Sequence, residues 1–268
     1  MGRSLLPDNY WAFDYGLVLT LFNESIDAAY LNLQLPSVES LVQEVLDNAI
    51  NLLDKIKIYE IQIQDVISNN RLQDALNIGF QLLEMLGVTL IDPTQVTITL
   101  PELDQLANFP AMADPNKAAA LRILVSMFSA IYNGNPALLQ PTIWTMVHLC
   151  TTEGHIPVSP VAYSVYGMSR CGSGHIAEGY QSGRIALTLV DVLDAKAVQC
   201  KILEQLGGFV SHWQEHARAT IEQFNQGLQS GLDMGDLEYA CHAAKNACAH
   251  LMLIGDPLDQ VQTKQAQH

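Results

Sequence analysis

Apolar residues recur at steps of three and four along most of the chain, which is the spacing of one face of an α-helix. One such stripe consists of Leu72, Ala75, Leu76, Gly79, Leu82, Leu83 and Leu86. Another consists of Leu237, Ala240, Ala244, Ala247 and Leu251, whose small residues allow close helix packing. The segment from Lys117 to Tyr132 is apolar on almost all sides, so we expect a central, buried helix there.

Capping residues followed by proline mark several helix starts, at Asp114-Pro115, Asn135-Pro136 and Ser159-Pro160. Turn residues between the stripes predict about eleven or twelve helices joined by short connections. Only the stretch from Val88 to Leu100 (VTLIDPTQVTITL) looks strand-like. Its β-branched residues and central proline indicate an extended linker with at most one short strand.

A weak internal repeat organises these helices. The segments NNRLQDALNIGFQLLEMLG, GSGHIAEGYQSGRIALTLV and GDLEYACHAAKNACAHLML each begin at a turn and continue with small and large residues at helical steps. We therefore predict an all-α fold, an array of antiparallel helical hairpins with degenerate tetratricopeptide-like repeats that winds as a right-handed solenoid. The expected parts are N-terminal hairpins in 1–90, an extended linker with a short helix in 91–113 and C-terminal hairpins in 114–268, forming one continuous array.

Composition narrows the classes of partner. The chain of 268 residues is 49% hydrophobic, and its 28 acidic and 13 basic residues give a net charge of −15. An acidic chain without a local basic cluster repels phosphate, so we expect neither nucleic acid nor a membrane as partner. The number of cysteines is odd, at five, with wide spacing, and the N-terminus lacks the apolar core of a signal peptide. These features predict free thiols in the cytoplasm.

The stretch HWQEH, from His212 to His216, is the most enzyme-like motif. It matches H-x-x-E-H, and on a helix His212 and His216 would share a face with Glu215 beside them, which makes a metal site sterically possible. A catalytic zinc needs a third protein ligand, and neither Glu222 nor Glu238 has the spacing of the inverted zinc proteases. We therefore expect no metal and interpret these side chains as capping, packing or solvated. A metal-dependent hydrolase using His212, Glu215 and His216 is the alternative.

Other catalytic motifs are incomplete. The segment from Gly167 to Gly172 has the second glycine of a nucleophile elbow one residue too late, and it follows a helical run. Cys171 and His175 are separated by an interhelical turn, so a nucleophile–base pair is not favoured. The sequence has no P-loop, HRD or DFG motif. We thus expect no catalytic and no cofactor-binding residues in this chain.

Several ordered blocks of the sequence resemble the helical region of large bacterial hybrid signalling kinases, known as multi-sensor signal transduction multi-kinases. The resemblance lies in LLPDNYWAFDYGLVLTLFNESIDAAYL, LLDKIKIYEIQIQ, RLQDALNIGFQLLEMLGVTL, LANFPAMADPNKAAALRILVSMFSAIY, HWQEH and GDLEYA. That family combines a serine/threonine kinase domain, an AAA-type ATPase domain, a long tetratricopeptide-like region, a GAF sensor and a histidine kinase. No position here matches a catalytic residue of the family.

The resemblance implies a non-catalytic interaction or regulatory region of a signalling kinase. Its expected partners are a protein or peptide, or neighbouring kinase and ATPase domains. Because the flanking domains are absent and a repeat array cut in this way leaves apolar ends uncapped, we expect a fragment of a longer protein. A stand-alone adaptor whose uncapped ends pair into a homo-oligomer remains an alternative.

Overall fold

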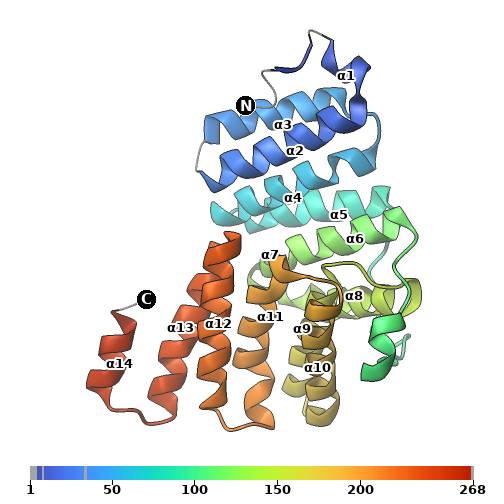
Figure 1. Cartoon of the computed structure of the whole chain (residues 1–268). Helices are drawn as coiled ribbons and strands as arrows, with labels where there is room; N and C mark the ends of the chain where they lie inside the picture. Colours follow the sequence, from blue (N-terminus) through green and yellow to red (C-terminus); the bar gives the residue numbers. More distant parts are fainter. Residues whose placement is uncertain (1–4, 8, 33–34, 267–268) are drawn as a thin grey trace. The chain divides into compact units, whose positions relative to one another are not determined.

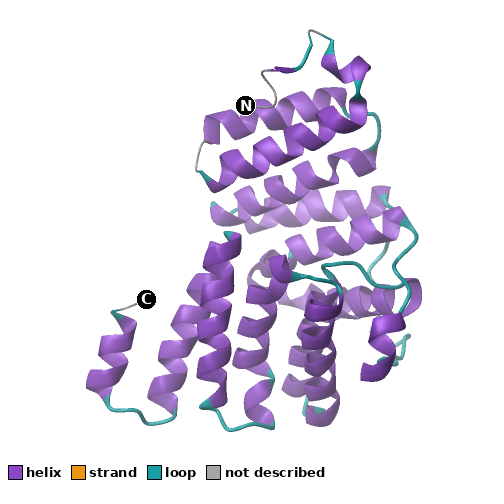
Figure 2. Cartoon of the chain, viewed as in Figure 1, coloured by secondary structure: helices purple, strands orange, loops and turns teal. Residues whose placement is uncertain are grey.

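The computed structural model describes residues 5–7, 9–32 and 35–266, and its regular elements are helices (Figure 1). Figure 2 shows no strand in the part of the chain that the structure describes. One isolated parallel bridge joins Ala111 and His155. The predicted all-α class is therefore confirmed. None of the helices in the described ranges has the length and apolar character needed to cross a membrane.

Two compact units divide the chain, one formed by Met1–Gly87 with Arg122–Asn135 and the other by Val88–Leu121 with Pro136–His268. The first contains α1 (Tyr10–Phe13), α2 (Tyr15–Leu31), α3 (Leu35–Asn48), α4 (Leu52–Ser68), α5 (Leu72–Met85), the end of α6 (Pro115–Ser126) and α7 (Phe128–Gly134). The second contains η2 (Leu103–Asn108), the start of α6, η3 (Pro136–Leu138), α8 (Leu139–Glu153), α9 (Ser159–Gly172), α10 (Ile176–Val192), α11 (Lys196–Phe209), η4 (Ser211–Trp213), α12 (Ala219–Met234), α13 (Leu237–Leu253) and α14 (Leu258–Gln265). Residues 122–135 pack with α4 and α5 and so belong to the first unit. The ranges 1–90, 91–113 and 114–268 remain a prediction.

The first unit is held together by an apolar core and by contacts from α6 and α7. Its α2, α3 and α4 bury a cluster that includes Val18, Phe22, Ile26, Val38, Leu41, Val42, Val45, Ile58 and Ile61. The guanidinium of Arg122 donates to the Glu60 carboxylate of α4, with Nε 2.8 Å from Oε1. The side chain of Met127 packs over Gly79 of α5 at a point where a methyl group would have no room. These contacts place residues 122–135 in the first unit.

Most of the apolar segment from Lys117 to Tyr132 is buried, as its sequence predicts, although Tyr132 itself is exposed. The segment is not one helix. Ile123, Leu124 and Ile131 are fully buried. Met127 leaves helical geometry, with φ −91° and ψ 0°, and separates α6 from α7. The start of α6 is as predicted, since Asp114 Oδ1 accepts from the backbone N–H groups of Asn116 and Lys117.

One turn geometry recurs between successive helices. Asn70, Gly174, Asp194, Gly235 and Gly255 all have positive φ. In each case the N–H of the next residue donates to the carbonyl five positions earlier, as in Ala195 to Val190 and Asp236 to Gly231. This is the Schellman bond that closes a helix C-terminus. The next helix begins within a few residues, so neighbouring helices return alongside one another.

Small residues let the helices of the second unit approach closely. An added Cβ at Gly179 of α10 would lie 2.7 Å from the Gly167 carbonyl oxygen of α9 and 2.9 Å from the backbone nitrogen of Cys171. A Cβ at Gly207 of α11 would meet the ring of Phe224 of α12 at 2.8 Å. The paired glycines of α9 and α10 therefore bring two backbones into direct contact.

The strand-like stretch is extended, and no strand is assigned there. Ile91 N–H donates to Thr145 Oγ1 at 2.8 Å, and Trp144 Nε1 donates to the Val96 carbonyl oxygen at 3.2 Å. Both side chains belong to α8, so this segment is fixed to a helix rather than to a neighbouring strand. The Ile91 N–H and the Val96 carbonyl thus find partners outside any sheet.

Candidate functional site

HWQEH lies in the turn between α11 and α12. His212 is in η4, and Glu215 and His216 lie in the loop that follows. Because α11 ends at Phe209 and α12 begins at Ala219, the helical spacing that would bring His212 and His216 onto one face is not formed. This connection replaces the Schellman turn found between other helices.

The three side chains of the motif do not converge on a common point. Glu215 accepts a hydrogen bond from the Tyr180 hydroxyl at 2.6 Å, and His216 Nδ1 accepts from the Arg218 backbone N–H at 3.1 Å. His212 Nδ1 is buried without a hydrogen-bond partner, and the His212 ring lies 6.2 Å from that of His250. Across residues 5–7, 9–32 and 35–266, no three His, Cys, Asp or Glu side chains gather in a metal-binding group. Glu215 and His216 thus form hydrogen bonds to neighbouring residues, Tyr180 and Arg218.

His250 belongs to the same packed region. Its Nδ1 lies 2.7 Å from the Thr220 hydroxyl oxygen, and its ring meets the buried ring of Phe224 edge to face at 4.9 Å. Burial lowers the pKa of His250, and the neighbouring His212 lowers it further. A neutral imidazole is thus favoured against these helices.

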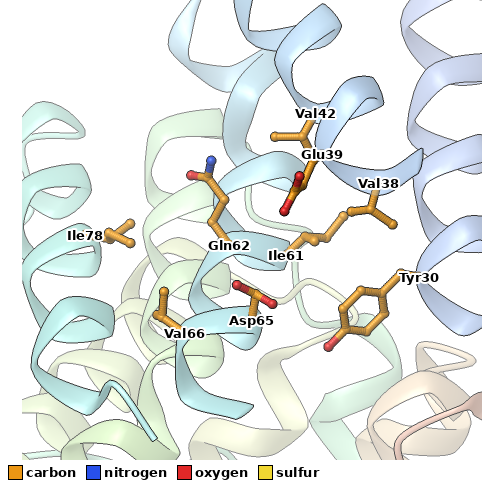
Figure 3. Close-up of a pocket in the computed structure, with 9 residues that line it drawn as sticks. All are labelled: Tyr30, Val38, Glu39, Val42, Ile61, Gln62, Asp65, Val66 and Ile78. Carbon is orange, nitrogen blue, oxygen red and sulfur yellow. The ribbon is translucent and has the colours of Figure 1, made fainter. Parts of the chain in front are cut away.

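A groove in the first unit is the better candidate for binding. It has a volume of about 390 Å³, within the range of pockets that hold ligands. Figure 3 shows the residues that line it, which come from α2, α3, α4 and α5: Tyr30, Val38, Glu39, Val42, Ile61, Gln62, Asp65, Val66 and Ile78.

The floor of this groove is apolar and firmly packed. Val38, Val42, Ile61 and Val66 are all buried to below one tenth exposure. Val38, Val42 and Ile61 belong to the core cluster of the first unit. The groove therefore has a shape set by the core and does not need a ligand to form it.

The rim of the groove is acidic and aromatic. Glu39 on α3 and Asp65 on α4 are exposed, and in Figure 3 their carboxylates point into the same space, with Tyr30 at one side and Ile78 at the other. None of the nine lining residues is basic. Lys57 of α4 is engaged elsewhere, by Asp27 at 3.0 Å. The groove thus offers an apolar floor beneath two negative charges.

No sequence pattern predicted this groove. Its apolar residues lie on ordinary helical stripes, and Glu39 and Asp65 resemble any solvated acid on a helix. Their grouping depends on how α3 and α4 pack, and no spacing within either helix reveals it.

Comparison with known proteins relates part of the chain to a signalling protein. No protein-family model matches the chain, and no solved structure matches it. It is 26% identical over 154 residues to hybrid signal transduction histidine kinase G of Dictyostelium discoideum. The match covers 56% of this chain and 4% of that protein, so the chain spans only a small part of the relative's length. The chain is thus similar to a short segment of a hybrid histidine kinase.

Proposed function

We propose that this chain is a non-catalytic helical interaction region of a signalling kinase and that it binds a segment of a partner protein or of a neighbouring kinase or ATPase domain. The observation that carries the proposal is the preformed groove between α3 and α4, which is open, has an apolar floor and is large enough for a protein side chain. The similarity to a segment of a hybrid histidine kinase supports the signalling context. We further propose that the helices form a tetratricopeptide-like right-handed array.

Two further observations support binding rather than chemistry. In HWQEH, Glu215 and His216 form hydrogen bonds to different residues, and the His212 ring packs near His250. The buried thiol of Cys150, which lies in α8, has its pKa raised to about 12 by burial, so it is a poor nucleophile. The surface best suited to recognition is therefore the groove.

A groove-filling substitution tests this function. Gln62 lines the groove and is half-buried, so Gln62→Trp places an indole in the space that a ligand would occupy. We expect peptides selected from a displayed random library on the wild-type chain to lose at least about tenfold in affinity for the variant, which corresponds to one apolar side chain displaced from the floor. Fluorescence anisotropy with the selected peptides gives the dissociation constants.

Gln64→Trp is the matched control. Gln64 lies two residues along the same helix, is exposed and does not line the groove. The selected peptides should bind this variant as they bind the wild type. If the selected peptides bind the wild type, Gln62→Trp and Gln64→Trp equally, or if the selection enriches no peptide, the groove is not the interaction site and the proposed function fails.

A further inference from the structure

We infer that the groove between α3 and α4 selects a cationic, apolar segment, with a lysine or arginine side chain held between Glu39 and Asp65 and an apolar side chain on the floor below. This inference rests on the proposed function and specifies the chemistry of the partner. The charge inside the groove favours a cation. Two exposed carboxylates point into one space, and none of the nine lining residues carries a positive charge to neutralise them.

The aromatic wall adds to the selectivity. The ring of Tyr30 stands at the side of the same space (Figure 3). A cation near an aromatic face is attracted by the ring quadrupole, and arginine and lysine are the side chains that provide one. Carboxylates and an aromatic ring together therefore favour a cationic side chain over a neutral one.

The apolar floor requires a second feature in the partner. Val38, Val42 and Ile61 belong to the core cluster, and Val66 is also buried. An apolar group covers these side chains more favourably than water does. A lysine or arginine alone would cover part of the floor with its methylene chain and leave its head at the rim. A segment with apolar and cationic residues adjacent in space satisfies both parts of the groove.

The charge of the whole chain assists without being specific. A net charge of −15 attracts any cation and speeds encounter. At physiological salt this attraction is screened over about 8 Å, so charges outside the groove contribute little once the segment is bound. The local pair of carboxylates can therefore be separated experimentally from the overall charge.

The test uses short fluorescein-labelled peptides with the full chain. One peptide is built from leucine and lysine, a second replaces every lysine by glutamate, and a third replaces every leucine by serine. We expect only the leucine–lysine peptide to bind appreciably. The double substitution Glu39→Lys with Asp65→Lys should weaken it by about tenfold, which is about 1.4 kcal/mol.

The control double substitution is Glu24→Lys with Glu84→Lys. Both residues are exposed in the first unit, neither lines the groove, and the change in net charge equals that of the groove variant. We expect less than about a twofold loss at physiological salt. Matching circular dichroism and melting curves establish that both variants are folded.

The outcomes distinguish selectivity for a cationic segment from the proposed binding of peptides in the groove. Equal weakening by the two double substitutions, or equal binding of the lysine and glutamate peptides, overturns cation selectivity and leaves the groove as a peptide site. Failure of every designed peptide to bind overturns the inference, whereas the proposed function stands or falls on the peptides selected against Gln62→Trp.

Discussion

Gly179→Ala is expected to lower the free energy of unfolding by about 3 kcal/mol, at the upper end of the usual cost of overpacking. The added methyl would lie 2.7 Å from the Gly167 carbonyl oxygen and 2.9 Å from the Cys171 backbone nitrogen. Backbone atoms cannot rotate away as a flexible side chain can, so α9 and α10 would have to separate. Urea unfolding followed by circular dichroism measures the loss.

Gly172→Ala is the control for that substitution. Gly172 is the last residue of α9, and a Cβ there would meet nothing within 4 Å. Alanine also favours the helix over glycine by up to about 1 kcal/mol, so this variant should be as stable as the wild type or slightly more stable. Equal destabilisation by the two substitutions would contradict the close contact of α9 and α10.

The second large expected effect is a change of stability with pH, and it comes from the buried carboxyl group of Glu204 on α11. Glu204 is 6% exposed, and its Oε1 accepts from Asn246 Nδ2 of α13 at 2.7 Å. Burial raises the pKa of Glu204 from 4.5 to about 7, although Lys245 and the Asn246 hydrogen bond act to lower it. The pKa of Glu204 is higher in the folded state than in the unfolded state, so protonation of Glu204 stabilises the fold. This contribution to the free energy of unfolding is fully present below about pH 4.5 and is lost as the pH rises through 7.

Replacing Glu204 by glutamine removes this dependence. The amide keeps an acceptor for Asn246 and carries no charge. At pH 8 the free energy of unfolding of the variant should therefore exceed that of the wild type by roughly 3 kcal/mol, which is the free energy that corresponds to a pKa shift from 4.5 to about 7. The advantage should disappear near pH 4.5. Chemical unfolding of both proteins at several pH values gives the difference.

Comparing the two proteins at each pH is necessary because another group titrates in the opposite direction. Burial lowers the pKa of His155 to about 4, so His155 destabilises the fold as the pH falls below 6.5. Both proteins contain His155, so its contribution cancels when their free energies of unfolding are subtracted at each pH. Exposed Glu238→Gln on α13 is the control for removing one negative charge. If the free energies of unfolding of Glu204→Gln and the wild type differ by the same amount at every pH, burial does not raise the pKa of Glu204.

Periodicity predicted the buried face of α5 well. Of the stripe along α5, the residues Ala75, Leu76, Gly79, Leu82, Leu83 and Leu86 are buried, with Leu72 partly so. The stripe along α13 was less accurate, since Leu237 is 59% exposed and Ala243 is the fully buried alanine. Alanine occurs at so many positions of α13 that several faces are equally plausible from sequence.

The turns show which local signals are sufficient. Gly174 and Gly235 adopt positive φ at predicted breaks, because glycine accepts that conformation without strain. Asp194 adopts it too, at a place where the sequence suggested no break. HWQEH matched a helical metal motif in sequence but forms an irregular turn, since its conformation depends on contacts with Tyr180 and Arg218.

Hydrogen–deuterium exchange of the full chain, with and without the leucine–lysine peptide, tests the binding account most directly. Helices that line an occupied groove open less often and exchange more slowly. We expect added protection in peptides spanning residues 30–42 and 61–78, and unchanged exchange in α9 to α14. Protection confined to α9 to α14, or none at peptide concentrations that saturate the anisotropy signal, would contradict the assignment of binding to the groove between α3 and α4.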